Sequence, residues 1–462
     1  MEIYIKSAVA YCNVCGKPEQ AMILSRNGSV FLERLCAVQG RRSVKLAADY
    51  SWYQKRSSYY KNFSRPLKTK PSEHGCPNDC GVCDWHSNKM LLPVFSITND
   101  CNLDCPKCFT YNRQDRKYYK SVEETERIID NILETSGGVQ LINLTGGEPT
   151  MHPDLFKIIE ACKKKGVGRI TMNSNGLRIA SDKEFARGIK ESGVQVILSL
   201  DTFDPEKSVK IYGRDISSHK RKTLENMEEL EIPATLLSVA IKNLNEGEIA
   251  GFCRDYIGKS FVKSFTIQNM TYTGMNGEGF QPREHITIDE VEAAIASEEP
   301  FNTNDFFPMA NYHFLCYSAA YYIVHEGRVI SLTKLFDKDT LVRMMTDSYL
   351  LQPDRNFSKE FMDGVSKLWA EGSDPEEIKA LKSFIKDAFP KDRDLSIEER
   401  RAFLESGVKM ILIHPHMDED NFDLERIAQC GDLVPDENGN SIPACSYNLL
   451  YRQKDERFWV EK

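Results

Sequence analysis

Short apolar segments alternate with amphipathic ones along the middle of the chain. The amphipathic segments have helical spacing, and Ser121-Val-Glu-Glu124 is a capping box at the start of one of them. Strands that alternate with helices predict an α/β fold, here a partial (β/α)6 barrel over residues 91–275 with its active site at the carboxyl ends of the strands. Six segments rich in β-branched residues predict its buried parallel strands, at residues 91–98, 139–146, 169–174, 194–200, 234–241 and 263–270.

Further helix signals extend this pattern. The capping sequence Ser181–Glu184 predicts a helix that ends near Gly193, and Pro153 suits the first turn of another helix. Similar capping sequences at 287–290 and 396–399 predict two helices beyond the barrel.

The regions on either side of the barrel differ from it. Residues 1–90 look irregular and hold six cysteines, which predicts a metal-stabilised N-terminal module. Residues 276–462 form a C-terminal region in which a charged stretch, 353–400, predicts exposed helices. Three cysteines also lie in this region: Cys316, Cys430 and Cys445.

Composition places the chain among globular proteins. Its 462 residues are 41% hydrophobic, yet no run approaches the roughly 18 apolar residues of a membrane span, and the N-terminus lacks the features of a signal peptide. We therefore expect a cytoplasmic protein. Fourteen cysteines in such a protein indicate metal ligation more than disulfides. Cys162 and Cys253 are exceptions, because each lies in a helix-like segment where cysteine is usually a small buried hydrophobe.

Charge excludes one class of partner. With 60 basic and 68 acidic residues the net charge is −8, which argues against nucleic acid. The segment from Arg41 to Lys70 departs from this average, with nine basic residues, one acid (Asp49) and interleaved aromatic residues. It is either a solvated loop over the core or a surface for an anionic substrate.

The central constellation is Cys101-Asn-Leu-Asp-Cys105-Pro-Lys-Cys108, directly after the first predicted strand. Three thiolates can hold three irons of a [4Fe–4S] cluster and leave the fourth iron open. An S-adenosylmethionine (SAM) molecule can chelate that iron through its amino and carboxylate groups. The alternative is a zinc knuckle, but a closed zinc site needs four ligands and no fourth is evident nearby.

The second predicted strand ends in Gly146-Gly147-Glu148-Pro149. Glycines at a strand end let the backbone approach a ligand, and Glu148 can accept hydrogen bonds from the SAM ammonium. A GGEP sequence alone would indicate only a turn, but its pairing with CxxxCxxC on the preceding strand is far more specific.

These two motifs resemble those of the radical SAM superfamily over about residues 91–275. The resemblance implies that Cys101, Cys105 and Cys108 are the cluster ligands and that Phe109 lies beside them. It also implies SAM contacts from a set of residues at strand ends: Gly146, Gly147, Glu148, Pro149, Asn173, Ser174, Ser199, Asp201, Ile241 and Gln268. Purely structural roles remain the alternative for the two strand-end pairs 173–174 and 199–201.

Two more cysteine groups precede the barrel. Cys76, Cys80 and Cys83 repeat the CxxxCxxC spacing and indicate an auxiliary cluster, with His86 either its fourth ligand or a histidine packed nearby. A CxxC pair with one distant cysteine resembles a mononuclear iron or zinc knuckle whose fourth ligand is unidentified: Cys12, Cys15 and Cys36.

A narrower resemblance spans almost the whole chain. GCPNDCGVCDWH, HPHMDEDNFDLERIAQC and IPACSYNLLYR are similar to segments of the archaeal pterin radical SAM methyltransferases and related tetraether lipid synthases. By this resemblance the three C-terminal cysteines are cluster ligands. The chain departs from the family pattern at Cys36-Ala-Val-Gln39-Gly, where the family often has Cys-Pro-x-His-Gly, and near residue 310, where a further family cysteine is missing.

The resemblance implies an enzyme that forms carbon–carbon bonds by radical chemistry, with C-methylation of a small molecule as the first hypothesis. Coupling of lipid hydrocarbon chains and maturation of a peptide or protein are the alternatives, and a non-enzymatic iron–sulfur or zinc scaffold would not require the GGEP loop. An electron donor such as flavodoxin or ferredoxin is expected as a partner. No cobalamin-binding domain is evident, so the methyl donor is either SAM or a folate-like carrier.

Overall fold

Six parallel strands form the centre of the molecule. The computed structural model describes residues 2–110, 116–136, 138, 140–344, 355–390, 393, 395–436 and 440–455. Neighbouring strands along the chain are also neighbours in the sheet, which confirms the α/β fold and its partial barrel. The strands are β5 (Leu92–Thr98), β6 (Leu141–Gly146), β7 (Arg169–Ser174), β8 (Gln195–Ser199), β9 (Ala234–Ala240) and β10 (Val262–Asn269).

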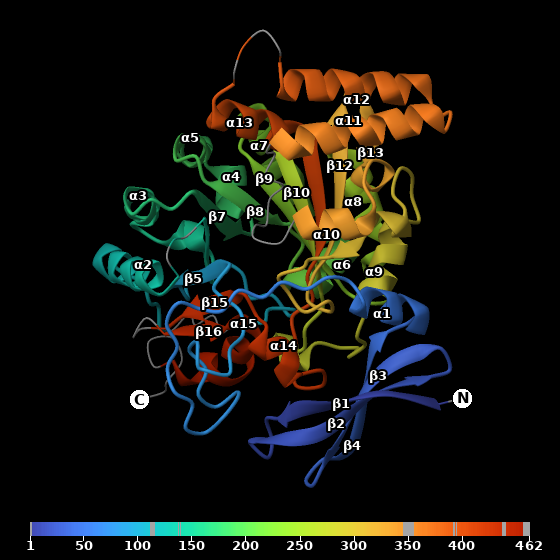
Figure 1. Ribbon diagram of the computed structural model, residues 1–462. Helices are drawn as coiled ribbons and strands as arrows, with labels where there is room; N and C mark the ends of the chain where they lie inside the picture. The colour runs from blue at the N-terminus through green and yellow to red at the C-terminus, as the bar shows by residue number, and fades with distance from the viewer. Residues whose placement is uncertain are drawn as a thin grey trace.

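Helices cover the outer face of these strands (Figure 1). Alternate strand residues such as Phe95, Ile97 and Met172 are buried in one core with the helices. Their neighbours Ser96 and Asn173 therefore face the barrel interior, because successive side chains of a strand point to opposite faces. The helices are α2 (Val122–Ser136), α3 (Leu155–Lys164), α4 (Leu177–Ser181), α5 (Lys183–Glu191), α6 (Pro205–Tyr212), α7 (Ser217–Glu229), α8 (Ile249–Tyr256) and α9 (Ile288–Ile295).

Two predicted helix starts are displaced by one or two residues. Ser181 ends α4, and Asp182 is the N-cap of α5 because its side chain accepts from the Phe185 N–H. Pro153 precedes α3, whose N-cap is Asp154. The capping boxes at 287–290 and 396–399 are confirmed.

The N-terminal region contains a regular sheet. The prediction of irregular structure is wrong for residues 2–47, which form four antiparallel strands, and is right for most of residues 58–91. The two edge strands escaped prediction because much of each is exposed, so polar residues interrupt the apolar pattern. The four strands are β1 (Glu2–Cys12), β2 (Lys17–Arg26), β3 (Ser29–Cys36) and β4 (Gly40–Ala47), followed by α1 (Tyr50–Ser57).

The C-terminal region extends both edges of the central sheet. β14 (Val408–Ile413) lies parallel to β10, and β12 (Ser318–His325) pairs antiparallel with β14. At the other edge β15 (Asp432–Pro435) lies parallel to β5. A single sheet thus contains strands from both sides of the predicted boundary at residue 275. The domain limits 1–90, 91–275 and 276–462 therefore stay a prediction. Three short strands complete the pairing: β11 (Phe307–Pro308), β13 (Arg328–Ser331) and β16 (Ser441–Pro443).

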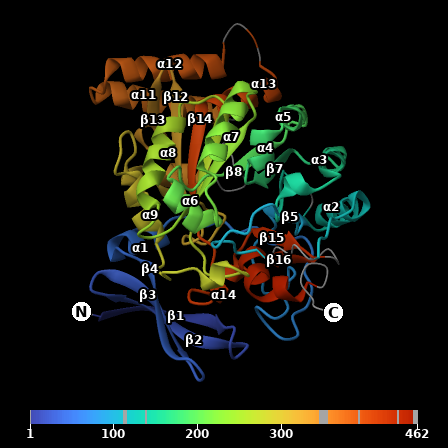
Figure 2. The ribbon, with the colours of Figure 1, turned by 180° about the vertical axis from the view of Figure 1, so that it is seen from behind.

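The charged stretch 353–400 is only half exposed where it is described. Phe361, Leu381 and Phe384 bury one face of its helices in a second core that includes Ile323 of β12. Helices α11–α13 lie at one end of the molecule and the N-terminal sheet at the other (Figures 1 and 2). The remaining helices are α10 (Lys338–Met344), α11 (Arg355–Ala370), α12 (Pro375–Ala388), α13 (Ile397–Gly407), α14 (Leu424–Ala428) and α15 (Ala444–Ser446).

The basic segment 41–70 is partly neutralised by acids of the same chain. Lys45 pairs with Glu290 at 2.5 Å, and the buried Arg56 pairs with Glu292 at 3.1 Å. The prediction of a solvated loop is wrong for Arg56, and the ion pairs of Lys45 and Arg56 connect the segment to α9.

Among the described residues, no helix is both long enough and apolar enough to cross a membrane.

Candidate functional site

The loop that carries Cys101, Cys105 and Cys108 leaves the carboxyl end of β5. Cys101 is buried, its sulfur accepts from the Leu103 N–H at 3.4 Å, and the Cys108 N–H donates to the Cys105 carbonyl at 3.0 Å. Burial raises the pKa of Cys105 to about 12 and also raises that of Cys101, with smaller contributions from the other thiols of the loop. The thiols of Cys101 and Cys105 therefore hold their protons until a metal displaces them.

The glycine loop after β6 holds this cysteine loop by its backbone. The Gly147 N–H donates to the Thr98 carbonyl at 2.8 Å, and the Glu148 N–H donates to the Asp100 carbonyl at 2.7 Å. A Cβ atom at Gly147 would lie 2.3 Å from the Asp100 oxygen, and one at Gly146 only 2.1 Å from that of Thr98. Only glycine permits this approach.

Glu148 is engaged within the protein. It is 1% exposed, and its carboxylate accepts from Ser174 Oγ at 2.9 Å and from the Asn175 N–H at 2.7 Å, as well as from Thr150. Burial raises its pKa despite these donors. Glu148 thus ties the glycine loop to the end of β7, together with the turn that begins at Pro149. Its contact with SAM stays a prediction.

Two polar atoms inside the barrel lack a protein partner. Ser96 Oγ on β5 and Asn173 Oδ1 on β7 are buried, and neither makes a hydrogen bond within the described part of the chain. A buried acceptor of this kind is costly unless a ligand or water satisfies it. Together with the buried thiols and the glycine cradle, these atoms fit a bound [4Fe–4S] cluster and SAM.

Asp201 holds the cysteine loop from the opposite side. Its carboxylate is fully buried, forms an ion pair with Lys107 and accepts from the Val239 N–H at 2.6 Å. Ser199 Oγ lies 3.5 Å from the same carboxylate. The structure therefore brings Ser199 and Asp201 to the loop between Cys105 and Cys108, with Asp201 acting on Lys107.

A third segment that contacts the cysteine loop lies against Phe109, and it was not predicted from the sequence. The Gly277 N–H donates to the Cys108 carbonyl at 2.9 Å, and a Cβ at Gly274 would lie 2.2 Å from the Phe109 oxygen. The paired glycines of Gly274-Met-Asn-Gly277, just after the last predicted strand, were the available signal. Ile241 is buried in one apolar cluster with Cys101.

His416 links Gln268 and Phe109 to the C-terminal cysteines. The Gln268 amide donates to His416 Nε2 at 3.4 Å, so Nδ1 carries the proton that faces Cys445 Sγ at 3.8 Å. The rings of Phe109 and His416 lie 5.6 Å apart. Burial lowers the pKa of His416 to about 3, which keeps the ring neutral. The sequence signal for this site was His414-Pro-His416. It directly follows β14, a strand that was not predicted.

Cys316, Cys430 and Cys445 lie in one neighbourhood. Burial raises the pKa of each thiol, and Cys316 adds to the rise at both Cys430 and Cys445. The buried Arg426 donates to Cys316 Sγ at 3.4 Å, and Cys430 Sγ donates to the Asp432 carbonyl at 3.2 Å. Their role as cluster ligands stays a prediction.

A row of rings runs from this group. His414 stacks on Tyr317 with ring centroids 4.0 Å apart, and His414 and His416 lie 4.5 Å apart. Tyr312 continues the row, 4.3 Å from Tyr317. Near residue 310, where the family cysteine is missing, Asn311 is buried and its side-chain amide has no partner among the described residues.

The second CxxxCxxC loop packs beside the C-terminal group. Cys76 and Cys80 share an apolar cluster with Cys445, and a hydrogen bond between Cys76 and Cys80 raises the pKa of Cys76 and lowers that of Cys80. Burial raises the pKa of Cys83, the third member of the loop. His86 donates from Nε2 to the Cys430 carbonyl at 2.8 Å. Only its Nδ1 therefore remains as a possible ligand atom.

The N-terminal cysteines meet at one end of the four-stranded sheet. Cys36 Sγ lies 3.6 Å from Cys12 Sγ and 3.9 Å from Cys15 Sγ. The N–H groups of Val38 and Gln39 both donate to Cys36 Sγ at 3.3 Å. The structure thus brings together the three predicted knuckle residues.

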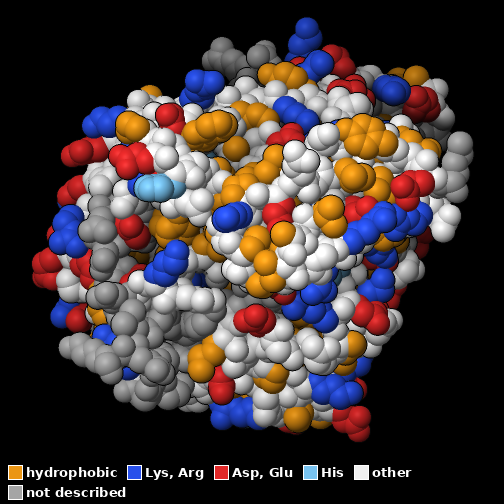
Figure 3. Space-filling view, turned by 90° about the horizontal axis from the view of Figure 1, so that it is seen from below, with side chains coloured by type: hydrophobic (Ala, Val, Ile, Leu, Met, Phe, Trp, Pro, Cys, Tyr) orange, Lys and Arg blue, Asp and Glu red, His pale blue; other side chains and the backbone are white. Residues whose placement is uncertain are grey.

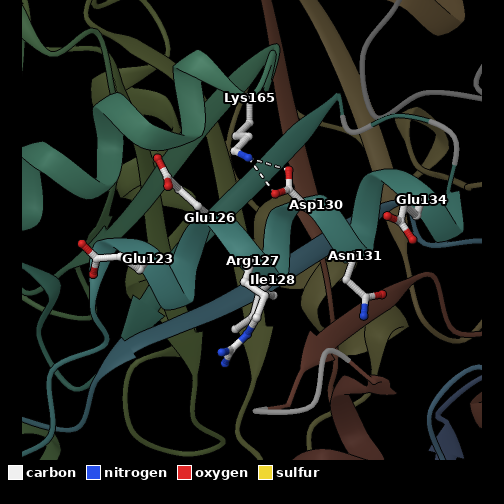
Figure 4. Close-up of a pocket in the computed structure, with 8 residues that line it drawn as sticks. All are labelled: Glu123, Glu126, Arg127, Ile128, Asp130, Asn131, Glu134 and Lys165. Carbon is white, nitrogen blue, oxygen red and sulfur yellow. Dashed lines mark hydrogen bonds and ion pairs between the residues drawn. The ribbon is translucent and has the colours of Figure 1, made fainter.

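A groove on α2 lies apart from these residues (Figure 4). It is lined by charged side chains such as Glu126, Glu134 and Lys165, and Lys165 pairs with Asp130. Because these residues lie on α2 and on the end of α3, they contribute no strand-end or cysteine side chain, and the groove is not the active site.

The chain is similar to several known proteins. The sequence profile of the Radical SAM superfamily matches residues 95–256. The 7,8-dihydro-6-hydroxymethylpterin dimethyltransferase of Methanocaldococcus jannaschii is 26% identical over 98% of this chain and 96% of its own. The GTP 3′,8-cyclase of Aquifex aeolicus is 30% identical over 48% of this chain and 68% of its own. The crystal structure of Streptococcus suis SuiB bound to S-adenosylmethionine matches 45% of this chain and 46% of that one, at 22% identity and a TM-score of 0.37.

The profile match begins within β5 and includes both the cysteine loop and the glycine loop that clasps it. A superfamily enzyme of this kind uses SAM at a [4Fe–4S] cluster. This chain belongs to the radical SAM superfamily of enzymes.

Proposed function

We propose that this radical SAM enzyme C-methylates a small pterin-like molecule. The observation that carries the proposal is the similarity to the M. jannaschii dihydro-hydroxymethylpterin dimethyltransferase, which extends over 98% of this chain and nearly all of that relative. Similarity over the whole length includes the regions outside the barrel.

Cys101, Cys105 and Cys108 would hold the cluster, and the open iron would bind SAM. When bound, this cofactor pair supplies the one-electron cleavage of SAM that starts radical chemistry. The protein itself positions the cysteine loop. Gly147 and Gly277 hold it by backbone hydrogen bonds, and the ion pair between Lys107 and Asp201 holds it by a side chain. Asn173 Oδ1, unsatisfied within the described residues, is a suitable acceptor for a SAM hydroxyl or ammonium group.

The barrel interior favours a polar substrate over a hydrocarbon chain. Ser96, Asn173, Ser199 and Gln268 all face it at or near the carboxyl ends of strands. A lipid chain placed against such groups would leave them without hydrogen bonds, at about 1–3 kcal/mol each. A heterocycle with ring nitrogens and an amino group can pair with them.

The row of rings from Phe109 to Tyr312 supports a flat substrate. His416 and His414 lie between the cysteine loop and Tyr317 and are kept neutral by burial, which lowers the pKa of each to about 3. Neutral imidazole and phenol rings stack on a planar heterocycle and also offer hydrogen bonds at their edges.

We further infer that the groups Cys76–Cys83 and Cys316–Cys445 hold auxiliary iron–sulfur clusters. Both groups consist of buried or half-buried thiols without disulfides, and Cys80 and Cys445 belong to the same apolar cluster. Their proximity to each other and, through His416, to Phe109 suits clusters that exchange electrons or hold a substrate near the SAM site. A flavodoxin- or ferredoxin-like donor would supply the electrons.

The test is product analysis with anaerobically reconstituted enzyme, methyl-deuterated SAM and a chemical reductant. A hydroxymethylpterin, an ether-lipid extract and a peptide library are offered in parallel. We expect methylated pterin as the only product, with deuterium in the new methyl groups where SAM is their donor, and no product with the Cys101→Ala variant. Coupled hydrocarbon chains, or a modified peptide without pterin methylation, would replace this proposal by one of the other radical reactions.

A further inference from the structure

We propose that Glu19 is the fourth ligand of a mononuclear divalent metal ion held by Cys12, Cys15 and Cys36. The four side chains offer one ligand atom each, and these atoms all lie within 4.8 Å of one another. The site is at the end of the N-terminal sheet where the β1–β2 and β3–β4 turns meet.

The sulfur positions select one ion over a cluster. A tetrahedral zinc ion with Zn–S bonds of about 2.3 Å places its sulfurs about 3.8 Å apart. Cys36 Sγ lies 3.6 Å from Cys12 Sγ and 3.9 Å from Cys15 Sγ, which matches that spacing. In a [4Fe–4S] cube each thiolate binds a different iron, so the cysteine sulfurs lie farther apart. The geometry therefore suits one tetrahedral ion.

Glu19 reaches the sulfurs from β2. Its Oε1 lies 3.3 Å from Cys15 Sγ. Its other oxygen, Oε2, is buried and makes no hydrogen bond within the described residues. A carboxylate oxygen buried beside three thiols without a donor is unfavourable unless a cation is present. A metal ion in the centre of this group removes that penalty.

Gln39 is the rival for the fourth position. Its Oε1 lies 3.4 Å from Cys12 Sγ, but it already accepts from the buried Arg34 at 3.3 Å. Arg34 also donates to the Tyr11 carbonyl at 2.7 Å. A neutral amide held by a guanidinium is a weaker ligand than a free carboxylate, so Gln39 is assigned to the surroundings of the site. Arg34 then offsets part of the negative charge of three thiolates and a carboxylate.

The ion would fix turns that apolar packing does not fix. Val14 and Val38 in the two turns are 57% and 67% exposed, and Leu35 near the end of β3 is 72% exposed. Exposed apolar side chains are scattered over this side of the molecule (Figure 3). Next to the site, the Tyr11 ring lies 6.1 Å from Phe422, and its hydroxyl donates to Asn78 at 3.4 Å. The ion thus holds the end of the sheet that contacts the second CxxxCxxC loop.

Zinc K-edge X-ray absorption on the full-length, cluster-reconstituted protein tests this assignment, because the iron–sulfur clusters do not contribute at that edge. Protein produced with added zinc should contain one zinc with three sulfur and one oxygen neighbour. Glu19→Cys should convert this to four sulfurs, and Glu19→Ala should weaken zinc retention against a chelator by about tenfold or more. Gln39→Ala, the matched control, should leave the three-sulfur, one-oxygen signature unchanged.

Two outcomes would overturn the proposal. Three sulfurs and one oxygen in Glu19→Cys would place the carboxylate outside the coordination sphere, and loss of the oxygen neighbour in Gln39→Ala would assign the position to the amide. Far-ultraviolet circular dichroism and reductive cleavage of SAM, measured on each variant, separate these results from misfolding, since neither Glu19 nor Gln39 belongs to the SAM site. A wild-type protein that retains no zinc would also reject the site.

Discussion

The two CxxxCxxC loops have the same spacing but different surroundings. The Cys101–Cys108 loop follows a parallel strand. Three contacts hold it: backbone hydrogen bonds from Gly147 and Gly277, and the side chain of Asp201. Cys76–Cys83 follows an irregular segment. It is held by a short backbone pairing with Lys70 and by the hydroxyl of Tyr451.

This difference shows that cysteine spacing alone does not set function. Spacing determines whether three thiolates can reach one cluster, whereas the surroundings determine what can reach the remaining iron. The first loop opens toward a barrel interior in which Ser96 Oγ and Asn173 Oδ1 find no hydrogen-bond partner among the residues that the structure describes. The second packs into an apolar cluster with Met417, Phe422 and Tyr447. We expect only the first to bind SAM.

Removal of the thiols tests this directly and has the largest expected effect. Replacement of all three cysteines by alanine in the 101–108 loop should abolish 5′-deoxyadenosine formation, because no iron remains for SAM. The same replacement in the 76–83 loop should leave SAM cleavage measurable and reduce product by about 10- to 100-fold. Both products are quantified by chromatography of one reaction.

The control is iron content. Each triple variant should lose about four irons relative to the wild type. If the 76–83 variant cannot cleave SAM while the 101–108 variant can, the two loops exchange roles.

Each of the two loops has a lysine beside it, Lys107 at the first and Lys70 at the second, and the two can be compared by the same substitution. Lys107→Met leaves the fully buried Asp201 carboxylate without its cation, at an expected cost of about 3–5 kcal/mol in the free energy of unfolding. Lys70 donates to the neutral Asn440 side chain at 3.5 Å, so Lys70→Met should cost less than about 1 kcal/mol. Urea midpoints of the reconstituted proteins compare them. Equal midpoints would mean that the Lys107–Asp201 pair does not stabilise the loop.

Much of the barrel could be predicted because its strands are buried on one face by helices and keep a simple apolar pattern. The six strands lie within about two residues of their predicted positions, and Gly146-Gly147 marked the close approach to β5 correctly. β14 was missed because it comes from residues 408–413, far along the chain, and joins β10 only through tertiary packing. No local signal specifies such a pairing.

The candidate site shows the same limit. The sequence grouped Cys316, Cys430 and Cys445 through resemblance, but it could not reveal that His416 lies between Cys445 and Gln268. Glu148 and Asp201 were expected to face SAM, and the structure engages both with protein donors. A residue type at a strand end indicates a site, whereas its partners depend on residues distant in sequence.

Gly147 tests whether backbone contact is what distinguishes the first loop. Gly147→Ala places a Cβ 2.3 Å from the Asp100 oxygen, so the strand-end loops must separate, with an expected loss of about 1–3 kcal/mol and slower SAM cleavage. Gly247→Ala is the control, because a Cβ there meets no atom within 4 Å. Thermal unfolding and the initial rate of deoxyadenosine formation are measured together. A Gly147→Ala enzyme indistinguishable from Gly247→Ala would show that the clasp is dispensable.

The smallest expected effect concerns Tyr451, which gives the second loop its side-chain anchor. Its hydroxyl accepts from the Cys80 N–H at 3.1 Å and lies 2.7 Å from the Pro77 carbonyl, to which it donates. Tyr451→Phe removes these bonds without changing the ring, so the free energy of unfolding should fall by about 1 kcal/mol. If the 76–83 loop holds an auxiliary cluster, product formation should fall several-fold while SAM cleavage keeps its rate, since the first loop is untouched. Tyr4→Phe removes an exposed hydroxyl that bonds to Ser7 and should change neither quantity. Equal losses of SAM cleavage and of product in Tyr451→Phe would instead mean that the two loops form one functional unit.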